Sequence, residues 1–162
     1  MSTATGSTGT NSSSTNSCTV RPFAFNDLKQ EEEKSFGSAP SWRTCNTGLN
    51  LHGKCCNPSC PAYNQLVIFM KGFGFFNFSK ILRKQKCPQC HEKCRADSIT
   101  NMSFYGCFLS IKGMRVINDE KLKILRKEST KVGSGKYTTF AELTGGSSVV
   151  EWYYLEVETE KE

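Results

Sequence analysis

The feature that most constrains this chain is a set of four cysteines arranged in two close pairs. Four residues separate Cys55 from Cys60, two separate Cys87 from Cys90, and 26 lie between the pairs. Tetrahedral Zn²⁺ takes four soft or borderline ligands at about 2.3 Å, and two short cysteine turns can supply them. Pro88 stiffens the second turn, so that both of its thiolates can face one ion. We therefore expect a structural zinc site formed by Cys55, Cys60, Cys87 and Cys90.

Other thiols and one imidazole lie close enough in the sequence to replace one of these ligands. Cys56 can take the place of Cys55, and His91 or Cys94 can replace the last cysteine of the second pair. His91 and Cys94 can also join Cys107 in a second site. An eight-ligand cross-brace around two ions is not expected, because the chain has a single clear CxxC pair. The substitute ligands are therefore Cys56, His91, Cys94 and Cys107.

The number of cysteines and the start of the chain indicate a reducing compartment. The chain has nine cysteines, an odd number that cannot all pair, and its first residues lack the basic and apolar regions of a secretory signal. Clustered thiols in a reducing compartment more often hold metal than form disulfides. No run of about 18 apolar residues is present to cross a membrane. We expect an intracellular protein of the cytoplasm or nucleus that is not secreted and has no membrane partner.

An ordered series of short motifs surrounds the cysteines. The series consists of GLNLHGKC at 48–55, Asn57, CPAY at 60–63, GFGFF at 72–76 and CPQC at 87–90. This series resembles a small cysteine-rich domain of largely uncharacterised protist proteins, GLNxxGxCxNxxCxAY…GFGxF…CPxC, over roughly residues 48–107. In some of those proteins the domain accompanies a ubiquitin-like domain, although this chain shows no ubiquitin-like segment. The resemblance implies that the motif cysteines are Cys55, Cys60, Cys87 and Cys90, with Cys107 as the last element.

Short apolar and aromatic runs between glycines predict strands rather than long helices. The runs on either side of the GFG turn, together spanning 65–78, predict a hairpin between the cysteine pairs, which is the layout of a zinc ribbon. The segment 98–117 reads as extended, and 121–124 alternates as a half-buried strand does, with a short helix as the alternative. The runs 137–143 and 149–158 predict a hairpin around a glycine-containing loop at 144–148. The expected fold is mainly β: a small zinc-ribbon-like domain with a β-hairpin extension and little helix.

Composition divides the chain into four parts. Residues 1–17 are almost entirely Ser, Thr, Gly and Asn, so they predict a disordered arm. Residues 18–44 form a transitional segment with scattered aromatics and a glutamate run. We expect the zinc-binding domain at 45–117 and the C-terminal β-hairpin extension, packed on it, at 118–162.

The formal net charge of +6 is unevenly distributed. Residues 52–95 carry eight Lys or Arg against one acid, whereas 137–162 carry one lysine against six glutamates. A basic, phenylalanine-rich zinc hairpin is suited to RNA or single-stranded DNA, with cations on phosphates and aromatics on bases. The interpretation that we favour is that the phenylalanines of 73–78 form the core of a small domain. The candidate nucleic-acid contacts are Lys71, Lys80, Arg83, Lys84 and Lys86.

The sequence shows no catalytic arrangement. The GSGK at 133–136 lacks the first glycine and the final Ser or Thr of a phosphate loop. Four thiolates around zinc leave no open position for water or substrate. We therefore expect no enzyme and no small-molecule substrate, but a non-catalytic zinc-stabilised protein-interaction module, alone or as a subunit of a larger assembly. The alternatives are a basic zinc-ribbon protein that binds RNA or single-stranded DNA, and, from the resemblance, a ubiquitin-pathway adaptor.

Overall fold

The computed structural model describes residues 21–142 and 148–162. The predicted disordered arm, 1–17, lies outside these residues, as do Cys18 and most of the loop predicted at 144–148. The described part of the chain is mainly β, which confirms the predicted fold class. Within it, no helix is long and apolar enough to cross a membrane. The short helical segments are α1 (Phe78–Ile81), η2 (Ser41–Arg43), η3 (Ala96–Ser98) and η4 (Ile117–Asp119).

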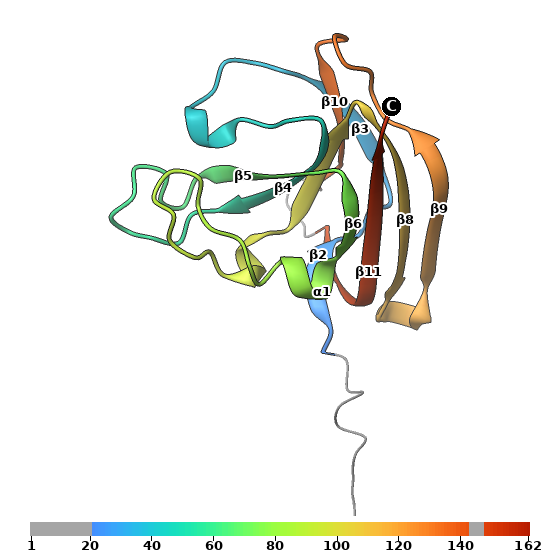
Figure 1. The fold of residues 1–162 in the computed structure, drawn as a ribbon. Helices are drawn as coiled ribbons and strands as arrows, with labels where there is room; N and C mark the ends of the chain where they lie inside the picture. The colour runs from blue at the N-terminus through green and yellow to red at the C-terminus, as the bar shows by residue number, and fades with distance from the viewer. Residues whose placement is uncertain (1–20, 143–147) are drawn as a thin grey trace, which may run out of the picture.

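Two antiparallel sheets form the body of the molecule (Figure 1). Sheet A has the order β3-β10-β7-β4-β5, with bounds Glu31–Ser35, Lys136–Phe140, Asn101–Tyr105, Gly48–Lys54 and Leu66–Gly72. Sheet B has the order β2-β11-β8-β9, with bounds Phe23–Asn26, Val149–Lys161, Cys107–Arg115 and Lys121–Glu128. The short strand β6 (Gly74–Asn77) pairs with the second half of β11.

One apolar cluster fills the space between the sheets. Alternate residues of each strand point into it, because successive side chains of a strand face opposite ways. Leu49 and Leu51 of β4 and Leu155 of β11 are fully buried there. Phe78 of α1 meets Phe25 of β2 edge-on, with ring centroids 5.0 Å apart. The first described strand is therefore part of the core, although its residues belong to the segment predicted as transitional.

The strands predicted within 65–78 form, but they do not pair with each other. β5 pairs with β4 in sheet A, whereas β6 pairs with β11 in sheet B. Gly72 (φ 76°) and Gly74 (φ 139°) adopt backbone conformations that L side chains rarely take, and the chain crosses between the sheets there. The predicted hairpin is wrong because a local turn signal does not determine which strand each arm will pair with. The zinc-ribbon part of the predicted fold is therefore not confirmed.

The predicted C-terminal hairpin is also wrong. β10 pairs with β3 and β7 in sheet A, whereas β11 pairs with β2, β6 and β8 in sheet B. β11 is 13 residues long and lies in the interior of sheet B, where a strand has neighbours on both sides. Residues 118–162 therefore supply strands to both sheets rather than a separate extension.

The segment 36–47, which we call the strap, lies over the outer face of sheet A. The Phe36 ring contacts the rings of Tyr105 and Tyr137, with centroids 5.1 and 5.2 Å apart. The η2 turn of the strap packs against β5. Both contacts hold the strap close to side chains on the face of sheet A that points away from the core.

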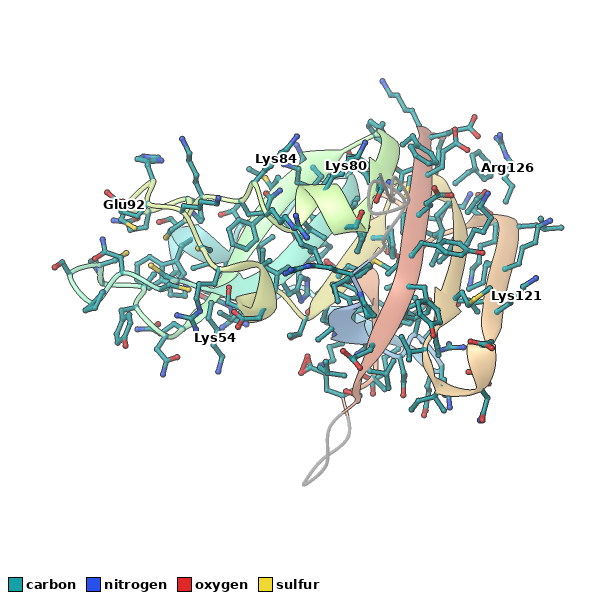
Figure 2. The ribbon with its side chains drawn as sticks, turned by 90° about the horizontal axis from the view of Figure 1, so that it is seen from below. Lys54, Lys80, Lys84, Glu92, Lys121 and Arg126 are labelled. Carbon is teal, nitrogen blue, oxygen red and sulfur yellow. The ribbon has the colours of Figure 1, made fainter. Side chains whose placement is uncertain are left out.

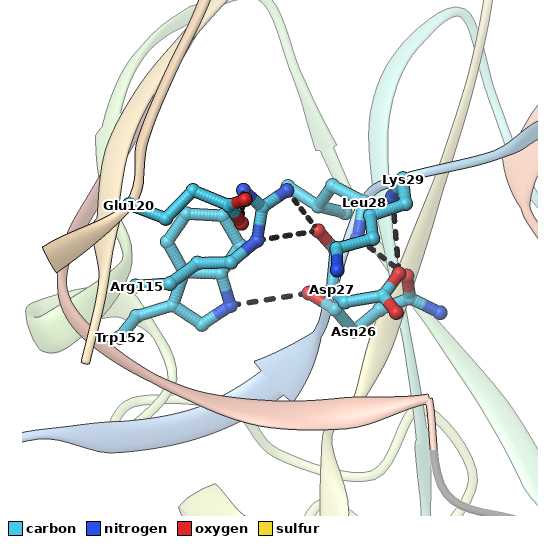
Figure 3. A network of polar contacts seen from close by, with 7 residues as sticks. All are labelled: Asn26, Asp27, Leu28, Lys29, Arg115, Glu120 and Trp152. Atoms are coloured by element: carbon cyan, nitrogen blue, oxygen red, sulfur yellow. Dashed lines mark hydrogen bonds and ion pairs between the residues drawn. The ribbon is translucent and has the colours of Figure 1, made fainter. Parts of the chain in front are cut away.

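A buried arginine links β8 to the segment that follows β2 (Figure 3). Arg115 is 5% exposed, and its Nε donates to the carbonyl of Asp27 at 3.0 Å, a bond that its Nη2 duplicates. Its Nη1 donates to Glu120 Oε1 at 2.6 Å, and the guanidinium lies 4.8 Å from the Trp152 ring centroid. Trp152 Nε1 donates to the carbonyl of Asn26 at 3.1 Å. These contacts hold the end of β2 and the residue after it to β8 and β11.

Candidate metal centre

The first cysteine pair lies on the loop that follows β4. Cys55 comes directly after the strand, and its carbonyl accepts from the amide of Asn64 at 2.9 Å, which closes the loop. The amide of Cys60 donates to the carbonyl of Asn57 at 3.0 Å, and the Asn57 side chain accepts from the amide of Ser59 at 3.0 Å. These bonds fold the residues between the two cysteines into a tight turn.

The second pair lies on a turn after α1. The amide of Cys87 donates to the carbonyl of Glu92 at 2.9 Å, and the amide of His91 donates to the carbonyl of Cys87 at 2.8 Å. Lys86 and Lys93 form an antiparallel bridge at the base of this turn. The turn is therefore a small closed unit that presents its two thiols together.

The two cysteine loops lie side by side at one end of the molecule, and four sulfurs converge there (Figure 1). The Sγ atoms of Cys55, Cys60, Cys87 and Cys90 all lie within 4.8 Å of one another. The Cys55–Cys90 and Cys60–Cys87 sulfur pairs are 3.7 and 4.0 Å apart. Sulfurs bound tetrahedrally to zinc at about 2.3 Å would be about 3.8 Å apart, so the arrangement is close to that of a metal site.

Backbone amides point at three of the four sulfurs. The pairs are Asn57 to Cys55 at 3.5 Å, Ala62 to Cys60 at 3.3 Å and Gln89 to Cys87 at 3.4 Å. An N–H donor stabilises a thiolate more than a thiol, because the acceptor is then charged. Such outer contacts orient and tune the ligands of metal sites. The four sulfur ligands, with these amides directed at them, therefore fit a soft or borderline divalent ion.

The environment makes the thiols unequal acids. The amide of Glu92 lowers the pKa of Cys90 to about 7. Burial raises the pKa of Cys55 and of Cys60. A thiol with a raised pKa stays protonated at neutral pH until a cation favours its thiolate, and metal binding then releases the proton. Without an ion, Cys55 and Cys60 are therefore protonated at neutral pH, whereas Cys90 is partly ionised.

The predicted substitute ligands lie outside the cluster. Among the described residues, the four-cysteine set is the one group of potential ligands that comes close enough to hold an ion. Cys56 Sγ instead lies 3.5 Å from a backbone carbonyl oxygen, and Cys107 lies in β8 of sheet B. His91 is exposed, and Cys94 is buried without joining the set. The geometry favours Cys55 over Cys56 in the first turn.

The candidate nucleic-acid contacts differ in their surroundings. Lys71 is half-buried, and its Nζ donates to Gln85 Oε1 at 3.2 Å, which ties β5 to the segment after α1. Figure 2 shows Lys80 and Lys84 on the side of α1, opposite Lys54. The exposed candidates are Lys80, Arg83, Lys84 and Lys86.

Arg83 also lines a surface feature that the sequence did not indicate. Two adjoining clefts share Arg83 and Asp97, and their other basic side chains are Arg21, Lys93 and Arg95. Asp97 is the acid of both clefts, and it is paired with Arg95 at 3.1 Å. Since Arg21 is far from the others in sequence, only the fold could group these residues. We call this feature the basic cleft.

The phenylalanines of 73–78 are divided between core and surface. Phe78 is fully buried, and Phe76 is packed against the core while partly exposed. Phe73 is 40% exposed and Phe75 is 61% exposed. The prediction that this set forms the core is wrong for these two, because the turn and alternate residues of β6 face solvent.

Comparison with known proteins adds no assignment to this geometry. No protein-family model matches the chain, and neither a curated protein nor a solved structure gives a significant match. The resemblance to the cysteine-rich protist domain therefore stays a prediction, and so does the identity of the metal.

Proposed function

We propose that this chain is a non-catalytic protein-interaction module whose fold is stabilised by a structural Zn²⁺. The observation that carries the proposal is the convergence of four cysteine sulfurs within 4.8 Å, three of them with amide donors. Four thiolates fill the tetrahedral coordination of zinc and leave no position for a substrate. The ion then acts on the fold, because it binds only when both loops are brought together.

The link between the loops matters because they lead to different parts of the fold. The first loop joins β4 to β5 within sheet A. The second lies between α1, which packs on β11 of sheet B, and β7 of sheet A. Three of the thiols, Cys55, Cys60 and Cys87, belong to the buried apolar cluster. A bound ion would therefore close one end of the core.

Exposed apolar side chains on sheet B support a protein partner. Phe75 and Leu125 are 61% and 70% exposed, and they line the same groove of about 180 Å³. Lys112, Lys123 and Glu156 also line this groove. Apolar side chains surrounded by charged ones are typical of protein-binding surfaces. We propose that an intracellular protein binds here.

The metal part of the proposal is tested on the purified full chain. We expect about one zinc per chain by elemental analysis, and loss of both zinc and circular-dichroism signal in the Cys87→Ser/Cys90→Ser double variant. Cys56→Ser is the matched control, because its thiol adjoins the cluster without joining it. A double variant that is folded and free of metal would contradict the proposal.

The partner part is tested with the Phe75→Ala/Leu125→Ala double variant. We expect it to lose proteins that the wild type captures from cell extract, because exposed aromatic and aliphatic anchors dominate such contacts. Val132→Ala is the control, since Val132 is 61% exposed and lies outside this groove. If the wild type, the double variant and Val132→Ala captured the same proteins equally, the partner would not bind at this groove.

The basic cleft favours a second function, binding of RNA or single-stranded DNA. Several cations along one cleft can contact successive phosphates, with affinity that falls steeply as salt rises. We expect Arg83→Gln/Arg95→Gln to weaken binding of an oligouridine about tenfold, as measured by fluorescence anisotropy at low salt. Lys123→Gln on sheet B should have no such effect. Absence of binding by the wild type at low salt would exclude this function.

A ubiquitin-pathway adaptor is the third candidate and rests on the sequence resemblance alone. It predicts saturable amide shifts when labelled chain is titrated with ubiquitin. A titration without amide shifts would exclude the adaptor function.

A further inference from the structure

Polar side chains on the outer face of sheet A are buried. The strand registers place Asn50 and His52 of β4, Asn101 and Ser103 of β7, and Thr139 of β10 on the face away from the apolar cluster. All of these except His52 are at most 3% exposed. An antiparallel sheet commonly leaves such a face to solvent, but here the strap lies over it. A polar space that is partly open to solvent therefore lies between strap and sheet.

Two adjoining cavities occupy this space. One has a volume of about 450 Å³ and is lined by residues of β3, β4, β7 and β10. The other, of about 220 Å³, lies against the strap. They share Arg43, His52, Leu66 and Tyr137, so they form one feature, which we call the strap cleft. Its volume lies in the range of small-molecule sites in proteins.

The charges of the strap cleft are incompletely balanced. Lys34 lies 4.0 Å from Glu32, and the other acid of the wall, Glu142, accepts a side-chain amide hydrogen bond at 3.2 Å. The guanidinium of Arg43 makes no hydrogen bond or ion pair with any residue that the structure describes. Lys54 adds a further positive charge to the wall. The cleft therefore has three cations against two carboxylates, with one guanidinium available to a ligand.

His52 supplies a neutral polar group to this cleft. Its Nε2 lies 2.8 Å from Ser103 Oγ. Burial, together with Arg43 and Lys34, lowers the pKa of His52 to about 4, which keeps the imidazole uncharged at neutral pH. Ser103 and His52 do not act as a nucleophile and its base. Ser103 is 2% exposed, and no carboxylate in the described part of the chain hydrogen-bonds to the imidazole to orient it. The cleft is thus suited to binding rather than to covalent chemistry.

We propose that the strap cleft binds a small organic anion, whose carboxylate or phosphate oxygens contact Arg43 and whose body lies against His52 and Tyr137. The planar guanidinium fork matches the oxygens of both groups. The volume of the partly open cleft suits a small molecule rather than a polymer. None of the four clustered cysteines lines the cleft, so this inference does not depend on the proposed metal function.

The test is an NMR titration of the full chain, purified with its metal. The probes are inorganic phosphate, acetate and phenyl phosphate, with sodium chloride at matched ionic strength and phenol as the uncharged control. We expect saturable shifts at His52, Ser103 and Tyr137, with a dissociation constant of about 1 mM or tighter for at least one anion. Phosphate and acetate arms show which oxyanion is preferred. Phenol should produce no saturable shift.

Variants tie the binding to the cleft. Arg43→Gln should weaken the affinity about tenfold or more, whereas Tyr137→Phe, which keeps the ring against which the ligand lies, should change it by less than about threefold. Lys121→Gln is the matched control, because it removes an exposed cation from sheet B that lies outside both the strap cleft and the groove. Shifts that stay linear with every anion up to about 20 mM would overturn the proposal. Equal affinity in the wild type and Arg43→Gln would overturn it as well.

Discussion

Single residues determine how readily the clustered thiols become thiolates. The amide of Glu92 lowers the pKa of Cys90 to about 7, so Cys90 is more acidic than Cys55 and Cys60, whose pKa values are raised by burial. The amides of Asn57 and Ala62 donate to the latter two sulfurs, at 3.5 and 3.3 Å. The environment therefore disfavours charge on Cys55 and Cys60 but favours it on Cys90, and a bound cation would stabilise all of these thiolates.

His52 makes stability depend on pH. Its pKa is about 4 in the fold and about 6.5 in an unfolded chain. The unfolded state therefore binds more protons between these values, and stability falls as the pH falls through that window. From about pH 7 to about pH 5, we expect the free energy of unfolding to fall by about 1–2 kcal/mol more in the wild type than in His52→Gln. Denaturant titrations with excess zinc measure this, and parallel losses in both proteins would contradict a buried neutral His52.

Gly48 is a position that tolerates no side chain. Its φ is 89°, and an added Cβ would lie 2.3 Å from the carbonyl oxygen of Gly72. We expect Gly48→Ala to destabilise the fold by about 2–4 kcal/mol, from overpacking and backbone strain together. Gly37→Ala is the control, because no atom lies within 4 Å of the added Cβ. Similar unfolding free energies for the two variants would show that the β4–β5 contact is looser than described.

At the scale of elements, Arg115 of β8 holds the segment that follows β2. Its side chain is buried and satisfies the carbonyl of Asp27 twice, so truncation leaves polar groups without partners. We expect Arg115→Met to cost about 2–4 kcal/mol. The exposed pair of Arg126 with Glu160 provides the comparison, and Arg126→Met should cost below about 1 kcal/mol. Equal losses in thermal unfolding would argue against a special role for the Arg115 contacts.

The elements also show what the sequence could predict and what it could not. The first half of β9, residues 121–124, follows from alternating residues, because side chains of a strand face opposite ways. The pairing of β5, β6, β10 and β11 does not follow, since each apparent hairpin crosses from one sheet to the other. The cysteine cluster was predictable because both pairs lie on tight local turns. The basic cleft and the strap cleft were not, because segments far apart in sequence form them.

At the scale of the whole molecule, the two sheets share one core that includes the first described strand. Phe25 of that strand is fully buried, with 0% relative exposure, and its ring contacts the ring of Phe78. We expect Phe25→Ala to destabilise the fold by about 3–5 kcal/mol, through lost burial and the cavity left behind. Phe75→Ala removes the same ring from a position 61% exposed and should cost below about 1 kcal/mol. Chemical denaturation measures the unfolding free energy of both variants. A small loss of unfolding free energy for Phe25→Ala would contradict the place of β2 in the core.

The cysteine cluster lies where the parts of this architecture meet, because its loops connect strands of sheet A with the segment that leads from sheet B. The most direct test is X-ray absorption at the zinc edge of the full chain, purified without chelator. We predict a first shell of sulfur alone, with about four atoms at about 2.3 Å. A shell containing nitrogen or oxygen ligands, or a folded chain that holds no zinc, would contradict the proposed centre.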